Sequence, residues 1–190
     1  MKKLLSALLL PALFLLCGCA RTLVVEEVLQ VSVNSRLFTA CNIWYEDPDS
    51  VSCENTLRGQ ILPFGTEVRI LSATDKEIVF RPEGSQQDFT ICYDESIRMM
   101  TPENYLRTIF TTESRDALSE GITPTNVEKI LRGVVEKGMS KKEVRLAYGP
   151  PCKYKTPDEK LDTWLYWTSF IAGKRVVFNN DRVVDIIVLE

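Results

Sequence analysis

The stretch KGMSKKEVRLAYGPP, residues 137–151, decides the architecture of the C-terminal part of the chain. Ser140 is followed three residues later by Glu143, which is the spacing of a capping box at the start of a helix. Gly149 and the two prolines after it end that helix, because proline cannot continue it. Gly138 is typical of the residue just beyond the last turn of a preceding helix. The stretch therefore predicts a short helix that follows closely on another one.

The residues on both sides extend this pattern into an α+β unit. Upstream, Thr125 and Glu128 again have capping-box spacing. Apolar residues then recur at helical intervals on one face: Val127, Ile130, Leu131, Val134 and Val135. Downstream are three strand-like segments, 163–168, 174–178 and 183–189. The last two flank Asn179–Arg182, a tight-turn signal typical of a hairpin. For residues 123–190 we therefore predict two helices packed on one face of a three-stranded antiparallel sheet.

The sequence segment from residue 127 to residue 187 resembles the SmpA/OmlA family of outer-membrane lipoproteins, the BamE-like proteins. The matching residues, in order, are Ile130, Gly138-Met139-Ser140, Val144, Tyr148-Gly149-Pro150-Pro151, Trp164-Leu165-Tyr166, Val177-Phe178 and Val183. The resemblance implies a BamE-like ααβββ domain. It also implies a non-catalytic accessory of β-barrel assembly that binds partner proteins of the envelope, and anionic phospholipid.

The first residues of the chain, MKKLLSALLLPALFLLCGCA, are typical of an export signal. Two lysines precede the apolar run Leu4–Leu16. That run is too short to span a bilayer, whose hydrocarbon core of about 30 Å needs roughly 20 apolar residues. We therefore interpret residues 1–18 as a secretory signal peptide.

The signal ends in Leu16-Cys17-Gly18-Cys19, which looks like the lipobox of bacterial lipoproteins. This similarity makes Cys19 the lipid-attachment residue and the first residue of the mature protein. Two or more acyl chains hold a protein on a membrane stably. Ala20 stands where an aspartate retains enterobacterial lipoproteins in the inner membrane, so the same similarity favours the periplasmic face of the outer membrane.

Between the anchor and the α+β unit we expect three segments. Residues 19–33 form the lipid anchor with a tether or first strand. Residues 34–100 are rich in short strands and turns, which predicts a small barrel or sandwich. Within them, residues 63–68 carry the phrase Pro-x-Gly-Thr-x-Val, which resembles bacterial SH3-like domains. Residues 101–122 form a linking helix, which begins at Thr101-Pro102, and a polar connection.

Composition limits the chemistry that the chain can perform. The chain has no histidine, which removes histidine-dependent nucleophilic sites and most zinc sites. It has neither a P-loop nor a Gly-x-Gly-x-x-Gly motif. The net charge of −3 becomes −5 when Lys2 and Lys3 leave with the signal, and an acidic body argues against nucleic acid as partner. We therefore expect no enzyme activity, no catalytic residue, no metal and no cofactor.

One basic cluster and one cysteine pair complete the candidate sites. Lys137, Lys141, Lys142 and Arg145 surround the start of the second helix of the α+β unit, and we consider them as a docking surface for anionic phospholipid or a partner protein. A solvated helix face is the simpler interpretation of the same charges. Beyond the signal and anchor, Cys41 and Cys53 close a short loop and are the first candidates for a disulfide. Cys92 and Cys152 are then left free or joined to each other.

The sequence thus predicts a two-domain lipoprotein that acts as a non-catalytic scaffold in outer-membrane β-barrel assembly or envelope integrity. One alternative is a periplasmic tether that binds peptidoglycan through the SH3-like domain. Another is an inhibitor or sensor, because the α+β unit also resembles β-lactamase-inhibitor modules.

Overall fold

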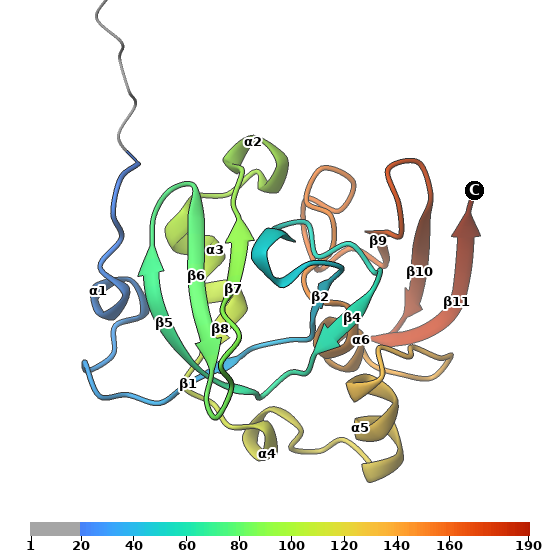
Figure 1. Cartoon of the computed structure of the whole chain (residues 1–190). Coiled ribbons are helices and arrows are strands. Elements are labelled where there is room, and N and C mark those ends of the chain that lie inside the picture. Colours follow the sequence, from blue (N-terminus) through green and yellow to red (C-terminus); the bar gives the residue numbers. More distant parts are fainter. Residues whose placement is uncertain (1–19) are drawn as a thin grey trace, which may run out of the picture.

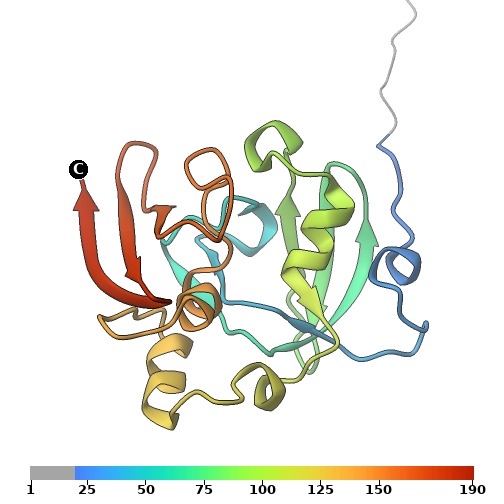
Figure 2. The same ribbon diagram turned by 180° about the vertical axis from the view of Figure 1, so that it is seen from behind.

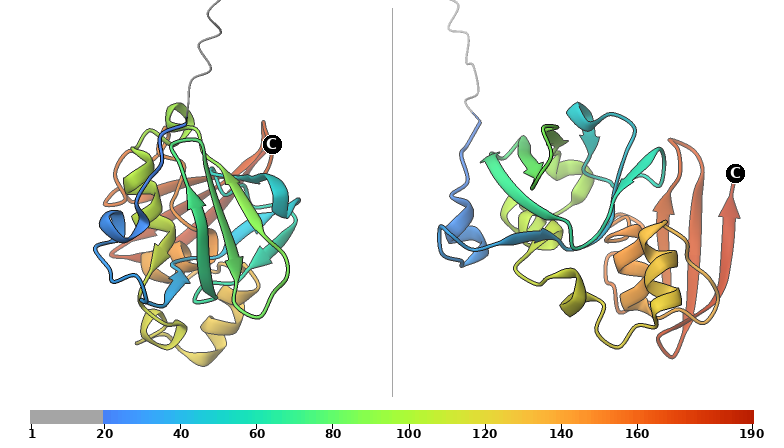
Figure 3. Two further views of the ribbon diagram at one scale, coloured as in Figure 1. Left: turned by 60° about the vertical axis from the view of Figure 1, so that its left-hand side comes forward. Right: turned by 60° about the horizontal axis from the view of Figure 1, so that its bottom comes forward.

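A computed structural model describes residues 20–190, so the predicted signal peptide and the lipid-attachment residue Cys19 lie outside the described part (Figure 1). Two sheets, each with its own hydrophobic core, stand side by side (Figures 1 and 3). The fold class is α+β, as the sequence predicts.

The N-terminal sheet is a curled, mixed sheet of six strands that forms a half-barrel. Its strands, in spatial order, are β3 (Val51–Ser52), β7 (Phe89–Cys92), β6 (Glu77–Pro82), β5 (Glu67–Ala73), β1 (Leu37–Thr39) and β8 (Phe110–Thr111). All neighbours are antiparallel except β3 and β7. The 3-10 turn η1 (Pro48–Ser50) leads into β3, and the short helix α2 (Glu95–Arg98) follows β7.

Helix α3 (Pro102–Ile109) covers one face of this sheet (Figure 2). Thr101 caps it with a side-chain oxygen on the Asn104 N–H, and proline occupies the first helical position, as predicted. Its inner face, Tyr105, Leu106 and Ile109, packs in the same core as the strands. The chain then returns to the sheet as β8, so this helix belongs to the N-terminal core and is more than a link between domains.

Residues 20–33, where we expect a tether or first strand, contain a short β-bridge at Thr22 and then a helix. Residues 25–29 form the short helix α1 (Val25–Leu29), which lies against α3. Val28 is buried, and Arg107 in α3 donates a hydrogen bond to its carbonyl. Leu23, just before the helix, is also buried in the N-terminal core. The segment therefore pairs with the end of β5 beside Thr22, and its apolar residues Leu23 and Val28 pack in the core.

The C-terminal sheet contains β9 (Thr163–Trp167), β10 (Gly173–Asn179) and β11 (Arg182–Leu189), with β10 in the centre and both pairings antiparallel. All three strands agree with the predicted segments. Asn180 and Asp181 both have positive φ angles, as a tight hairpin turn between twisted strands requires. Trp164, Tyr166 and Phe178 are buried in the core that the sheet shares with its helices.

Those helices are α5 (Pro124–Leu131) and α6 (Lys141–Tyr148), and the short helix α4 (Arg115–Leu118) precedes them. The predicted capping box at the start of α6 is confirmed, since both of its reciprocal hydrogen bonds form. The predicted start of α5 is wrong, because Thr123 rather than Thr125 is its cap. Its predicted length is wrong too: the helix ends at Leu131, and Gly133 turns the chain with a φ of +65°. Residues 134–135 therefore lie beyond it.

A two-stranded ribbon from the N-terminal half joins the two cores. It consists of β2 (Ile43–Tyr45) and β4 (Gln60–Leu62). Trp44, Leu57 and Phe64, which lie in or beside the ribbon, pack in the core of the C-terminal helices and sheet. Residues that we assigned to the β-rich domain thus supply part of the core of the α+β unit.

Candidate binding groove between the two sheets

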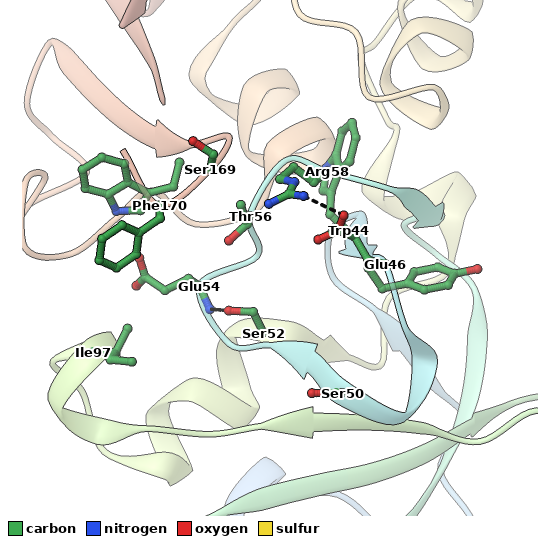
Figure 4. Close-up of a pocket in the computed structure, with 12 residues that line it drawn as sticks. Trp44, Glu46, Ser50, Ser52, Glu54, Thr56, Arg58, Ile97, Ser169 and Phe170 are labelled. Carbon is green, nitrogen blue, oxygen red and sulfur yellow. Dashed lines mark hydrogen bonds and ion pairs between the residues drawn. The ribbon is translucent and has the colours of Figure 1, made fainter. Parts of the chain in front are cut away.

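A groove of about 490 Å³ lies where the ribbon, the edge of the six-stranded sheet and the β9–β10 loop meet (Figure 4). Trp44 and Glu46 line one side of it, and Ile97 and Phe170 line the other. Hydroxyl groups line it between these sides: Ser50, Ser52 and Thr56. The groove thus combines aromatic surface with hydrogen-bonding groups, the mixture typical of ligand and peptide sites.

On the ribbon side of the groove, a glycine and an ion pair lie where the two strands approach each other. Gly59 has a φ of +77°, and a Cβ there would lie 2.2 Å from the Tyr45 carbonyl oxygen. Only glycine therefore fits where the start of β4 approaches the end of β2 so closely. Across it, Arg58 Nη2 donates to Glu46 Oε1 at 2.9 Å (Figure 4). Both side chains are exposed, so this ion pair contributes little stability. Because the two charges are opposite, the pair adds no net charge to the groove.

Two buried asparagines fix the ribbon to the C-terminal unit. The Asn42 amide donates to the carbonyls of Ile130 and Ala147, and its oxygen accepts from the Phe64 N–H at 2.9 Å. Asn55 acts in the same way, with its amide bonded to the Tyr148 carbonyl at 2.8 Å and its oxygen to the Trp44 N–H. Removing such a side chain leaves buried backbone groups unpaired. The groove therefore has rigid support.

The opposite side of the groove comes from the end of β9 and the loop after it. Trp167 Nε1 donates to the Cys152 sulfur at 3.2 Å, and the Trp167 carbonyl accepts from the Leu57 N–H at 2.9 Å. The loop closes on itself, because the N–H groups of Thr168 and Ser169 both donate to the Ala172 carbonyl. This closed turn projects Phe170 into solvent, where its side chain is 98% exposed.

A buried charged pair lies behind the groove. Arg98, the last residue of α2, is fully buried, and its three guanidinium nitrogens have no hydrogen-bond partner among the described residues. Its Nη1 lies 3.8 Å from Oε1 of Glu54, too far for a hydrogen bond, and its Cζ lies 5.7 Å from the Tyr105 ring centroid. Glu54 lines the groove (Figure 4). Behind the groove, Glu54 Oε1 and the guanidinium nitrogens of Arg98 therefore have no hydrogen-bond partner among the described residues.

The surroundings of Glu54 shift its pKa upward. Burial is the largest cause, because it disfavours the charged carboxylate. The charge of Arg98 and a hydrogen bond from the Cys152 thiol oppose the shift only in part. The Glu54 carboxyl is thus easier to protonate than an exposed glutamate.

The hydroxyl groups of the groove contact backbone and thiol groups. Ser52 Oγ accepts from the Glu54 N–H at 3.2 Å, Ser169 Oγ accepts from the Ala172 N–H at 3.0 Å, and Ser50 Oγ lies 3.7 Å from the Cys92 sulfur. Within residues 20–190, no group of three or more carboxylate or cysteine side chains is placed to hold a metal ion.

The predicted basic cluster is engaged inside the C-terminal unit. Each of its members has a partner: Lys137 with Asp185 at 2.9 Å, Lys141 with Asp162 at 3.3 Å, Lys142 with the Glu120 carbonyl at 3.0 Å, and Arg145 with Glu159 at 2.8 Å. Lys141 also lies over the Trp164 and Phe178 rings. These charges therefore take part in local contacts, and the docking surface stays a prediction.

The predicted disulfide does not form in this structure. Cys41, Cys53, Cys92 and Cys152 all carry free thiols, and only Cys92 is exposed. Burial raises the pKa of Cys41 to about 11, which makes its thiol a poor nucleophile. Cys41 and Cys53 both pack in the N-terminal core, where they act as small apolar side chains.

The groove residues were not predicted from the sequence. Trp44, Glu54, Ile97 and Phe170 come from four separate parts of the chain, and neither their spacing nor their neighbours indicates a common site. Nothing in the sequence of residues 47–59 indicates that this part of the chain faces the end of β9.

No family model, curated protein or solved structure matches the chain. Of the helices within residues 20–190, none is long and apolar enough to cross a membrane.

Proposed function

We propose that the chain is an outer-membrane lipoprotein, anchored through Cys19, that acts as a non-catalytic accessory of outer-membrane β-barrel assembly or envelope integrity. The partner it binds is an envelope protein. The lipobox supports the anchor, and the resemblance of residues 127–187 to the BamE-like family supports the class of partner.

The groove between the two sheets is the observation that carries a binding role. Its sides are held by buried asparagines and by backbone hydrogen bonds, so it needs little ordering on binding. It lies beside β3, an edge strand of the six-stranded sheet, with indole rings and hydroxyl groups within reach. An extended polypeptide segment fits this combination, because the backbone of the segment finds hydrogen-bonding groups and its apolar side chains find aromatic surface.

Photo-cross-linking in the native envelope tests this proposal. A photoreactive amino acid at Thr56, inside the groove, should yield adducts with a protein of the barrel-assembly machinery, identified by mass spectrometry. The matched control is the same amino acid at Glu120, an exposed residue between α4 and α5, and it should yield no such adduct. Adducts with peptidoglycan alone, or equal yields from both positions, would overturn the proposal.

A further inference from the structure

The described part of the chain makes contacts directly after the proposed lipid-attachment residue. Arg21 N donates to Asp75 Oδ1 at 2.9 Å, and Asp75 N donates back to the Arg21 carbonyl at 3.0 Å. Thr22 forms a β-bridge with Thr74, and the buried Leu23 follows. The chain is therefore fixed to the β5–β6 turn from residue 21 onward.

This early attachment leaves almost no tether. Only Ala20 separates Cys19 from Arg21, and an extended chain spans at most about 3.5 Å per residue. Arg21, which is bonded to the β5–β6 turn, therefore lies within about 7 Å of an acylated Cys19. A body held so closely must present the end that carries this turn to the membrane surface.

The same end carries exposed apolar side chains. Figure 1 shows the β5–β6 turn, α2 and the β9–β10 loop together at the end where the described chain begins, and Figure 2 shows the same arrangement from behind. Phe170 and Ile171 in that loop are 98% and 77% exposed. Ile97 in α2 and Met99 just after it are about half exposed. The free energy of the system falls when apolar side chains on a surface that faces a bilayer move from water into the bilayer.

We infer that this end of the molecule is a membrane-contact surface, on which Phe170 and Ile171 enter the interface of the bilayer and Ile97 lies beside it. The inference rests on the proposed lipid anchor. The acyl chains on Cys19 attach one side of this surface to the membrane, and the β9–β10 loop attaches the other side. These two attachment points fix the tilt of the protein on the membrane. Ile97 and Phe170 also line the groove, which therefore opens toward the bilayer. Its ligand accordingly approaches along the membrane surface.

The contact is testable with a polarity-sensitive dye on single cysteines. The exposed Cys92 is first replaced by serine in the full lipoprotein, because the other three described cysteines are buried. The NBD dye is then attached at Phe170→Cys, at Ile97→Cys or at the control Glu120→Cys, which lies at the opposite end between α4 and α5. Each labelled protein is purified from membranes with its acyl chains and reconstituted in vesicles of phosphatidylethanolamine and phosphatidylglycerol.

We expect dye emission at positions 170 and 97 to rise severalfold in vesicles and to be quenched by nitroxide-labelled lipid, with no change at position 120. Mass spectrometry of the same samples reports whether Cys19 is acylated. An acylated protein whose dye at position 170 behaves like the control would overturn the contact surface and leave the anchor intact. A protein without acyl chains on Cys19 would overturn both.

Discussion

At the scale of single residues, two glutamates withdrawn from water have pKa shifts of opposite sign. Burial raises the pKa of Glu54. Burial would do the same to Glu143, but hydrogen bonds from Ser140 and Asn126 and the charge of Arg182 reverse the shift, so that its pKa is lowered. The two residues should therefore have opposite effects on the pH dependence of stability.

The folded-state pKa of Glu54 lies above the unfolded value, so the stability it contributes is present in acid and is lost as pH rises through that raised pKa. For Glu143 the contribution is present above the unfolded pKa and is lost as pH falls through the lowered folded pKa. At neutral pH, Glu54→Gln should thus unfold at the same urea concentration as the unchanged protein or at a higher one. The difference in unfolding midpoint between the two proteins should vanish at about pH 4. Glu143→Gln should cost about 1.5 kcal/mol at neutral pH and less in acid. Equal losses for both variants at every pH would contradict this assignment.

At the scale of elements, the turn after α5 depends on a glycine that lies against the ring of Trp44, a groove residue. Gly133 and Gly121 both have positive φ, at +65° and +78°. A Cβ on Gly133 would lie 2.1 Å from Cζ2 of Trp44, whereas a Cβ on Gly121 would meet nothing within 4 Å. Gly121→Ala should therefore cost only the backbone strain, about 1 kcal/mol.

Gly133→Ala should cost clearly more than its control, because the Trp44 indole must also move. Urea unfolding measures the difference, and near-ultraviolet circular dichroism should show a changed tryptophan signal for Gly133→Ala alone. Matching losses of stability for the two glycine variants would show that the contact with Trp44 is unimportant.

The elements also show which parts of the fold were predictable. Local signals sufficed for the capping box of α6, for the start of α3 at Thr101 and for the hairpin at Asn180-Asp181, because nearby backbone groups satisfy each of them. The end of α5 was missed, since Gly133 ends that helix where the Trp44 ring packs against it, a contact distant in sequence. The groove was missed for the same reason, because its residues meet only through tertiary packing.

At the scale of the whole molecule, the two cores share one junction. Asn42 is fully buried and bonds to Ile130 and Ala147 on one side and to Phe64 on the other. Phe64, from the N-terminal half, packs in the C-terminal core. We therefore expect the two units to unfold together.

Asn42→Ala should lower the free energy of unfolding by about 3 kcal/mol, because it leaves several buried groups unpaired. The transition should stay single, with far-ultraviolet circular dichroism and tryptophan fluorescence coinciding along a urea titration. Asn34→Ala, at an exposed position, is the control and should change little. Two separate transitions in the unchanged protein would show that the units are independent.

Residues 137–151 and the first twenty residues carry most of what the sequence indicates about the whole molecule, namely an α+β unit and an anchored body. The proposed orientation at a membrane depends on contacts that no local pattern contains, such as the bonds between Arg21 and Asp75.

We propose above all that the folded body is held at a membrane through Cys19. Intact-mass spectrometry of the protein extracted from the membrane fraction tests this anchor. We expect a mature chain that begins at Cys19 and carries the mass of its acyl groups, and a Cys19→Ser variant that loses them. A mature chain that begins at another residue, or an unmodified Cys19 in membrane-bound protein, would contradict the claim.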